Sequence, residues 1–241
     1  MGEAAFYGFV GASALIIAAE VAFAFNLRRD VVGLIMAFGV GALISSLSFE
    51  LVLPSLQVAE TWEVALGLLL GSLTFIAGDW AIGRMGGSGR KNSEGEEDGS
   101  GLGIVLGTVL DGIPESAVLG MSIATGGGVS VSFLAAIWIS NFPESLGSTV
   151  GLEKSGTSRL RIRLMWGAIV LISIVASALG FAIADSFSEV NGALVQSFAA
   201  GALLTMIASE MAPEGFRRGG LPVGLATTLG FILAVWLTTF E

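Results

Sequence analysis

Two short segments of this chain place acidic side chains beside a proline inside apolar sequence. They read Asp111-Gly-Ile-Pro-Glu-Ser116 and Ser140-Asn-Phe-Pro-Glu-Ser145. An ionisable group at membrane depth costs roughly 2.5–3.5 kcal/mol to insert, so a carboxylate kept there is a candidate for function. Each proline lacks an N–H and leaves the carbonyl four residues before it without its usual helical partner. Carboxylates beside such carbonyls offer the oxygen donors that a cation site requires.

Helical spacing predicts that these polar groups share faces. Asp111 and Glu115 are four residues apart, and so are Ser140 and Glu144. Residues at this spacing lie on the same side of a helix. Two such oxygen-bearing stripes on neighbouring helices would line a cavity. Grouped carboxylates raise one another's pKa unless a cation joins them, so we expect metal binding to release protons.

The composition predicts a polytopic helical membrane protein. Hydrophobic residues make up 54% of the chain and charged residues 13%, with 35 glycines and a mean hydropathy of +0.85. The apolar runs are unbroken rather than alternating, which argues against a β-barrel. Cysteine and histidine are absent, so thiolate and imidazole ligands are excluded. The net charge of −9 argues against nucleic acid as a partner.

Segments of about 20 apolar residues can each cross the hydrocarbon. The predicted spans cover residues 4–26, 31–54, 63–83, 102–125, 129–151, 162–184, 191–213 and 220–240. All lysines and arginines fall after the odd-numbered spans, so the positive-inside rule places both termini outside. Residues 84–101 are rich in Gly, Ser and charge and predict a flexible cytoplasmic loop. The N-terminus lacks the basic residues of a signal peptide, so we expect a retained helix in a multi-pass protein of the plasma (inner) membrane.

An internal repeat links the second and seventh spans. Residues 41–50 and 201–210 share a Gly-Ala-Leu start and a terminal glutamate, Glu50 or Glu210, with Pro54 or Pro213 close behind. The predicted topology makes the two copies antiparallel, as in inverted-repeat transporters. The fold class is therefore an all-α membrane protein of eight transmembrane helices in a 3+2+3 arrangement, forming one domain over residues 1–241. Glu50 and Glu210 are candidates for the permeation pathway.

Glu20 and Asp79 are further acids inside predicted spans. Each is either part of the pathway or a protonated packing element. Apart from Arg163 at the start of span 162–184, the apolar spans contain no lysine or arginine, and we expect their carboxylates not to be neutralised by basic side chains, which is the main reason to expect a cation as the substrate.

These segments resemble the ZIP (Zrt-, Irt-like) family of divalent metal transporters. The family's fourth-span signature is His-Asn-x-Pro-Glu-Gly. Asp111 and Gly112 stand at its first two positions, Pro114-Glu115 match it, and Pro143-Glu144 match the fifth-span signature. Ser209-Glu210-Met-Ala-Pro-Glu214 resembles the family's acidic exit segment. The resemblance implies eight spans, outside termini and a metal site between spans four and five.

The departures from the family pattern imply one site of oxygen ligands. Gly112 replaces an asparagine, and Ser177 stands where a sixth-span glutamate would support a second metal. The resemblance then implies a ligand set on spans four and five, namely Asp111, Glu115, Ser140, Asn141 and Glu144. Oxygen ligands suit Mn²⁺, Mg²⁺ or Ca²⁺ better than zinc, although Zn²⁺ and Fe²⁺ also bind carboxylates. The expected protein is a transporter rather than an enzyme, and its partners are the divalent ion and the lipid bilayer.

Three alternatives stay open at this stage. The same fold could act as a metal sensor or as a proton- or sodium-coupled carrier of another substrate. An intramembrane aspartyl protease would pair Asp79 with Asp111.

Gly67-Leu-Leu-Leu-Gly71 is a small-xxx-small pattern that either forms a homodimer face or packs helices within one chain.

Overall fold

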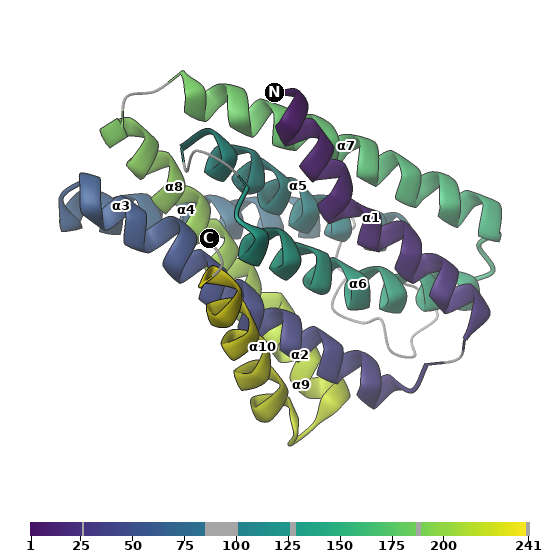
Figure 1. The fold of residues 1–241 in the computed structure, drawn as a ribbon. Coiled ribbons are helices and arrows are strands. Elements are labelled where there is room, and N and C mark those ends of the chain that lie inside the picture. The colour runs from purple at the N-terminus through teal and green to yellow at the C-terminus, as the bar shows by residue number, and fades with distance from the viewer. Residues whose placement is uncertain (26, 85–100, 126–128, 187–188, 240–241) are drawn as a thin grey trace.

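The computed structural model describes residues 1–25, 27–84, 101–125, 129–186 and 189–239, and for residues 82, 83, 101–111, 125 and 189–191 only the backbone. Within these ranges the chain consists of helices joined by short loops, and these residues form no strand (Figure 1). In chain order the elements are α1 Gly2–Ala24, α2 Arg29–Ser46, the π-helical η1 Leu47–Val52, α3 Leu53–Val58, α4 Thr61–Arg84, α5 Gly101–Thr125, α6 Val131–Lys154, α7 Arg159–Asp185, α8 Glu189–Met206, the π-helical η3 Ile207–Met211, α9 Ala212–Gly219 and α10 Val223–Thr238.

The described residues of the eight predicted spans are helical apart from a few at the ends of three of them. Among the described residues, five helical stretches are long and apolar enough to cross a membrane, and α10 is a shorter apolar helix. The five are Gly2–Ala24, Arg29–Val58, Thr61–Ala81, Arg159–Asp185 and Gly192–Gly219. The prediction of an all-helical protein with several helices long and apolar enough to cross a membrane is therefore confirmed for the described residues. Most of the predicted loop 84–101 lies outside the described residues.

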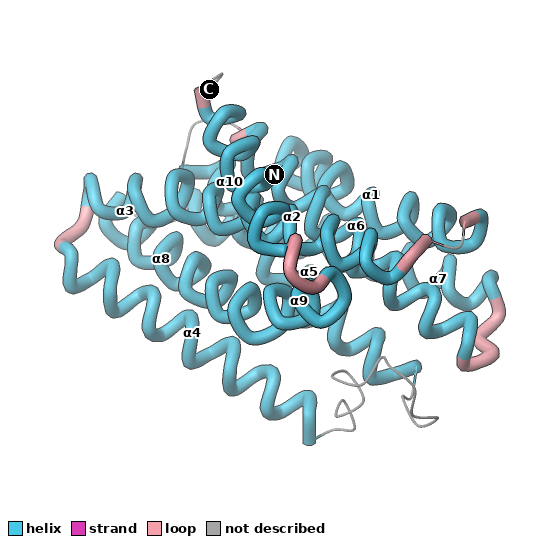
Figure 2. The backbone as a smooth tube through the Cα atoms, turned by 90° about the horizontal axis from the view of Figure 1, so that it is seen from below, coloured by secondary structure: helices cyan, strands magenta, loops and turns pink. Residues whose placement is uncertain are grey.

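Helices α5 and α6 run through the middle of the bundle (Figure 1). Helix α1 packs on α6 and on α7, and α7 packs along α5. Helix α2 packs on α10, and α4 lies along α8 (Figure 2). Helix α2 also packs against α6. This contact joins the group formed by α1, α5, α6 and α7 to the pair formed by α2 and α10.

Glycines allow several of these helices to touch backbone to backbone. A Cβ added at Gly120 of α5 would lie 1.8 Å from the carbonyl oxygen of Ser177 on α7. The same addition at Gly71 of α4 would lie 1.8 Å from the Phe198 carbonyl oxygen on α8, and one at Gly67 would lie 2.7 Å from Ser197 Cβ. Small residues permit such approaches in membrane helices. The Gly67–Gly71 pattern thus packs α4 on α8 within one chain.

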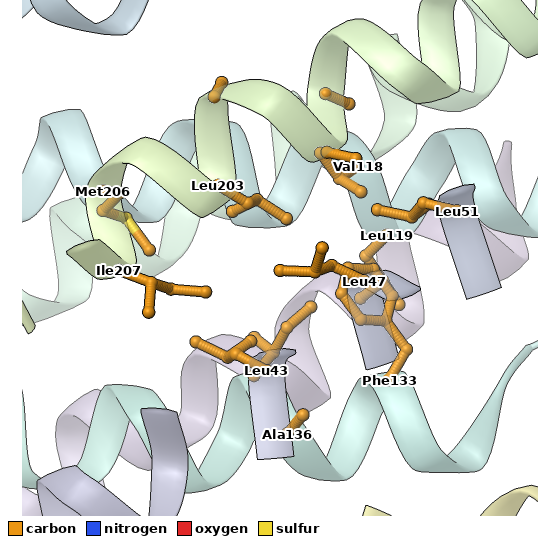
Figure 3. Close-up of a cluster of buried hydrophobic side chains, with 14 of the residues drawn as sticks. Leu43, Leu47, Leu51, Val118, Leu119, Phe133, Ala136, Leu203, Met206 and Ile207 are labelled. Atoms are coloured by element: carbon orange, nitrogen blue, oxygen red, sulfur yellow. The ribbon is translucent and has the colours of Figure 1, made fainter. Parts of the chain in front are cut away.

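The apolar core lies where the central helices meet α2 and α8. Figure 3 shows its buried side chains converging from α2 and η1, α5, α6, and α8 with η3. The fully buried members include Leu43, Leu51, Leu119, Phe133 and Leu203. Because core residues of this size pack closely, they hold α5 and α6 in a defined relation to each other and to α2.

Two helical stretches change to π-helix at corresponding positions. The stretch from α2 to α3 passes through η1, which contains Glu50, and the stretch from α8 to α9 passes through η3, which contains Glu210. A proline follows each π segment, at Pro54 and Pro213, and its missing N–H disrupts the regular hydrogen-bond ladder. Short π segments inside α-helices are frequent at functional sites.

Candidate cation site

Glu115 is a carboxylate buried in the interior of the bundle. It follows Pro114 inside α5, and only 2% of its surface is exposed. The Ser140 hydroxyl on α6 lies 3.3 Å from Glu115 Oε1 and 2.9 Å from the Ile137 carbonyl oxygen, and can donate its proton to either. The two proline-containing helices therefore contact each other through a carboxylate and a hydroxyl, in keeping with polar stripes that face each other, and metal binding by Glu115 and Ser140 stays a prediction.

Asn141 is buried next to Ser140 and connects α6 to α1. Its Nδ2 donates to the Gly11 carbonyl oxygen at 3.3 Å. Its Oδ1 is buried, and among the described residues no donor bonds to it. Such an atom is uncommon in a folded protein and calls for an explanation such as a bound ion or water. Asn141 thus has one polar atom used for packing and one available as an acceptor.

The remaining two predicted ligands are only partly placed. Glu144 lies one turn after Ser140 on α6 and is half-buried. Asp111 belongs to α5, one turn before Glu115, but its side chain lies outside the described residues. Within the described part of the chain, no three acidic side chains are grouped closely enough to hold a metal. The five-ligand site stays a prediction.

The predicted pathway residues occupy different surroundings. Glu50 in η1 accepts a hydrogen bond of 3.0 Å from the hydroxyl of Ser132 on α6, so α6 contacts two of the membrane glutamates. Glu210 in η3 is half-buried and its Oε1 is enclosed. Asp79 is half-buried in the last turns of α4. Their role in permeation stays a prediction.

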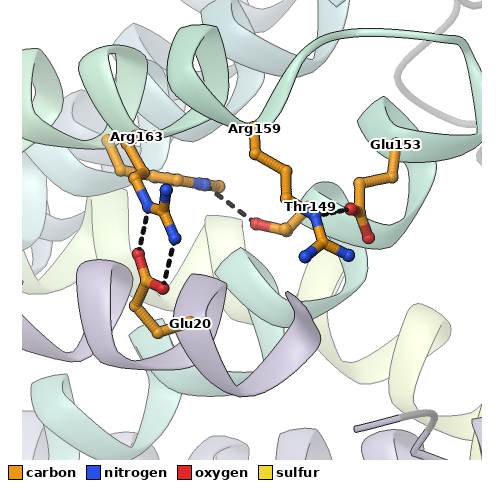
Figure 4. Close-up of polar contacts among 6 residues, drawn as sticks. Glu20, Thr149, Glu153, Arg159 and Arg163 are labelled. Atoms are coloured by element: carbon orange, nitrogen blue, oxygen red, sulfur yellow. Dashed lines mark hydrogen bonds and ion pairs between the residues drawn. The ribbon is translucent and has the colours of Figure 1, made fainter. Parts of the chain in front are cut away.

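The expectation that the membrane carboxylates lack basic partners is wrong for Glu20. Arg163, near the start of α7, holds it with two hydrogen bonds of 2.6 and 2.8 Å (Figure 4). Arg159 and Arg163 also lie over the ring of Phe23, and Arg159 pairs with Glu153 of α6 at 2.7 Å. Arginines at helix ends can reach across to a neighbouring helix, because their long side chains extend past the end of the span. We refer to these five residues as the arginine cluster.

A second ion pair was missed by the sequence analysis. Arg218 donates from Nε to Glu214 Oε1 at 2.5 Å within α9, and Arg217 also pairs with Glu214. The four-residue spacing of Glu214 and Arg218 is the signal that could have revealed this pair. Both side chains are largely buried, with 15% and 14% exposed, which the spacing does not reveal.

The chemistry of the central site follows from its donor atoms. Glu115, Ser140 and Asn141 contribute a carboxylate, a hydroxyl and an amide carbonyl from α5 and α6, and all three residues are buried. Oxygen donors of this kind coordinate hard divalent cations. No protein-family model and no curated protein matches this chain. What the site can do is therefore inferred from its own residues.

Proposed function

We propose that this protein carries divalent metal cations across a membrane through the site between α5 and α6. The ligands in this proposal are Asp111, Glu115, Ser140, Asn141 and Glu144. The observation that carries it is the burial of the Glu115 carboxylate, 2% exposed, inside a bundle with membrane-length apolar helices. A cation bound beside this carboxylate would offset the cost of enclosing its charge.

The polar atoms around Glu115 favour a metal ion over a purely structural role. Ser140 supplies one hydrogen bond at 3.3 Å, which is long for a hydroxyl donor. The buried Oδ1 of Asn141, one residue further along α6, accepts nothing among the described residues. A cation between the helices would be coordinated by a Glu115 carboxylate oxygen and by Asn141 Oδ1. It would thereby offset the cost of enclosing these two oxygens. Oxygen ligands favour Mn²⁺, Mg²⁺ or Ca²⁺ as substrates over Zn²⁺ or Fe²⁺.

The packing supports the proposed inverted repeat of three, two and three spans. If the first three spans correspond to the last three in order, the α2–α10 pair corresponds to α8–α4, and α5–α7 corresponds to α6–α1. All four of these helix pairs, α2–α10, α4–α8, α5–α7 and α1–α6, pack extensively against each other. The π segments that contain Glu50 and Glu210 correspond under the same scheme. This agrees with the resemblance of the two proline segments to the ZIP family.

Metal flux into proteoliposomes tests the proposal. We expect uptake of Mn²⁺ by the parent protein, and a loss of at least tenfold in Glu115→Gln and Glu144→Gln. Glu20→Gln is the matched control, because Glu20 is a helix glutamate whose charge Arg163 already balances. It should keep at least half of the parent rate. Uptake that is unchanged in both site variants would contradict the proposal.

Coupled proton release gives an independent measure. If the carboxylates share protons in the empty site, metal binding to purified protein in weak buffer should acidify the medium. The acidification should be absent from Glu115→Gln. Metal binding without a change of pH would show that the site is already ionised when empty.

A further inference from the structure

The Glu214–Arg218 pair lies where three helices meet. Arg218 is near the end of α9, and its backbone is packed against the first turn of α2, where a Cβ added at Gly33 would lie 2.6 Å from Arg218 Cβ. Its guanidinium reaches in the other direction to α6. A Cβ added at Gly147 would lie 2.8 Å from Nη1 of Arg218 and 3.2 Å from Nη2. The guanidinium thus fills the space between α9 and α6.

Gly147 belongs to the face of α6 that carries the candidate ligands. It is three residues after Glu144, and residues at this spacing are neighbours on a helix surface. Arg218 therefore places a permanent positive charge about one turn of α6 away from Glu144. Its carboxylate partner, Glu214, is only 15% exposed and is also held by Arg217.

We propose that Arg218 is a tethered counter-ion that closes the α9 end of the path, and that a divalent cation reaching Glu144 displaces it from Glu214. This inference rests on the proposed transport function. A guanidinium carries one charge and cannot be deprotonated in a protein, so it stabilises the Glu214 carboxylate when no substrate is near. A divalent ion has twice that charge and repels the guanidinium more strongly than Na⁺ or K⁺ does. Arg218 then makes release from the site depend on a divalent substrate.

The chain contains no cysteine, so one introduced thiol reports on this region alone. Ser148 follows Gly147 in α6 and is half-buried, so Ser148→Cys reports on access of reagents to this part of the helix. The rate of labelling by a charged maleimide in detergent needs no assumption about orientation in a membrane. Ser155→Cys, at an exposed position after α6, should be labelled quickly under every condition and gives the upper limit.

The first comparison uses no metal. We expect Arg218→Gln to accelerate labelling of Ser148→Cys at least fivefold, and Arg217→Gln to leave the rate within twofold of the parent. The control is matched, because Arg217 also pairs with Glu214 but is 48% exposed. Glu214→Gln should accelerate labelling as well, and it decides the matter if Arg218→Gln does not fold. Equal rates in the parent and in these variants, or an equal acceleration by Arg217→Gln, would overturn the proposal.

The second comparison tests displacement. Mn²⁺ should accelerate labelling in the parent, whereas NaCl at the same ionic strength should not, and Glu144→Gln should abolish the effect of Mn²⁺. If Mn²⁺ has no effect on a parent protein that takes up Mn²⁺ into proteoliposomes, Arg218 is not displaced by substrate and the inference fails while the transport function stands. If uptake fails but Arg218→Gln still accelerates labelling, the closure is present and the transport function is wrong.

Discussion

Two groups of polar side chains are built in opposite ways, namely the arginine cluster on α1, α6 and α7 and the central site on α5 and α6. In the arginine cluster, each carboxylate has a guanidinium within 2.7 Å, and most of these side chains are exposed (Figure 4). At the central site, Glu115 and Asn141 are buried, and their contacts include the Ser140 hydroxyl and the Gly11 backbone carbonyl. The protein balances charge at the ends of its helices and keeps oxygen donors in the interior.

The energies of the two groups differ accordingly. Exposed ion pairs contribute about 0–1 kcal/mol, because water already stabilises both charges. A buried carboxylate costs several kcal/mol unless a partner compensates for it. The arginine cluster is therefore explained by its position at helix ends, whereas at the central site the proposed cation would offset the cost of enclosing the Glu115 carboxylate. This difference is the physical basis of the transport proposal.

The largest expected effect comes from removing the interior carboxylate. Mn²⁺ at a concentration of about 100 times its Kd should raise the free energy of unfolding of the parent protein by about 2.7 kcal/mol. Glu115→Met should abolish this stabilisation. The same change should leave the metal-free protein equally stable or more stable, since an apolar side chain no longer pays desolvation. Thermal unfolding with and without Mn²⁺ measures both quantities. A metal-free protein that is destabilised by more than about 3 kcal/mol would show that Glu115 is structural.

A smaller effect is expected from the hydroxyl that joins α5 to α6. Ser140→Ala removes the contact to Glu115 at 3.3 Å and should weaken Mn²⁺ binding by about two- to tenfold, in keeping with one hydrogen bond of about 0.5–1.5 kcal/mol. Ser155→Ala, at an exposed position, is the control. Equilibrium titration of Mn²⁺ measures the affinity. An unchanged affinity in Ser140→Ala would remove Ser140 from the ligand set.

The smallest effect is expected in the arginine cluster. Arg163→Gln should lower the free energy of unfolding by at most about 1 kcal/mol, because Glu20 and Arg163 are both about half exposed. The difference from the parent should shrink in 1 M NaCl, where the Debye length is about 3 Å. Metal binding should not change. A loss of metal binding in Arg163→Gln would contradict the claim that the arginine cluster and the central site act independently.

The helices could be predicted from the sequence because a membrane imposes length and hydropathy on each span. The predicted span 162–184 falls within α7, Arg159–Asp185, and 102–125 within α5, Gly101–Thr125. The spacing also predicted polar stripes on the two proline segments, and the 3.3 Å contact between Ser140 and Glu115 is in keeping with stripes that face each other. The π segments could not be predicted from a single proline, because Pro114 and Pro143 lie inside helices that stay α-helical.

Side-chain contacts between different helices could not be predicted from the spacing of residues in the sequence. The sequence placed Glu20 and Arg163 near the ends of two different spans, but their pairing depends on how α1 and α7 pack. The family resemblance implied Asn141 as a ligand but not the bond that its Nδ2 donates to the Gly11 carbonyl on α1. Only its Oδ1 stays available to a cation. The difference arises because residue 141 lies about 100° around the helix from Ser140.

Anomalous diffraction from crystals grown with Mn²⁺ tests the central claim most directly. The account predicts a single strong peak between α5 and α6, within about 2.5 Å of carboxylate oxygens of both Glu115 and Glu144. The peak should vanish in Glu115→Gln crystals grown under the same conditions. A parent protein with no peak between these helices, or with Glu115 and Glu144 directed away from each other around an empty apolar contact, would contradict it.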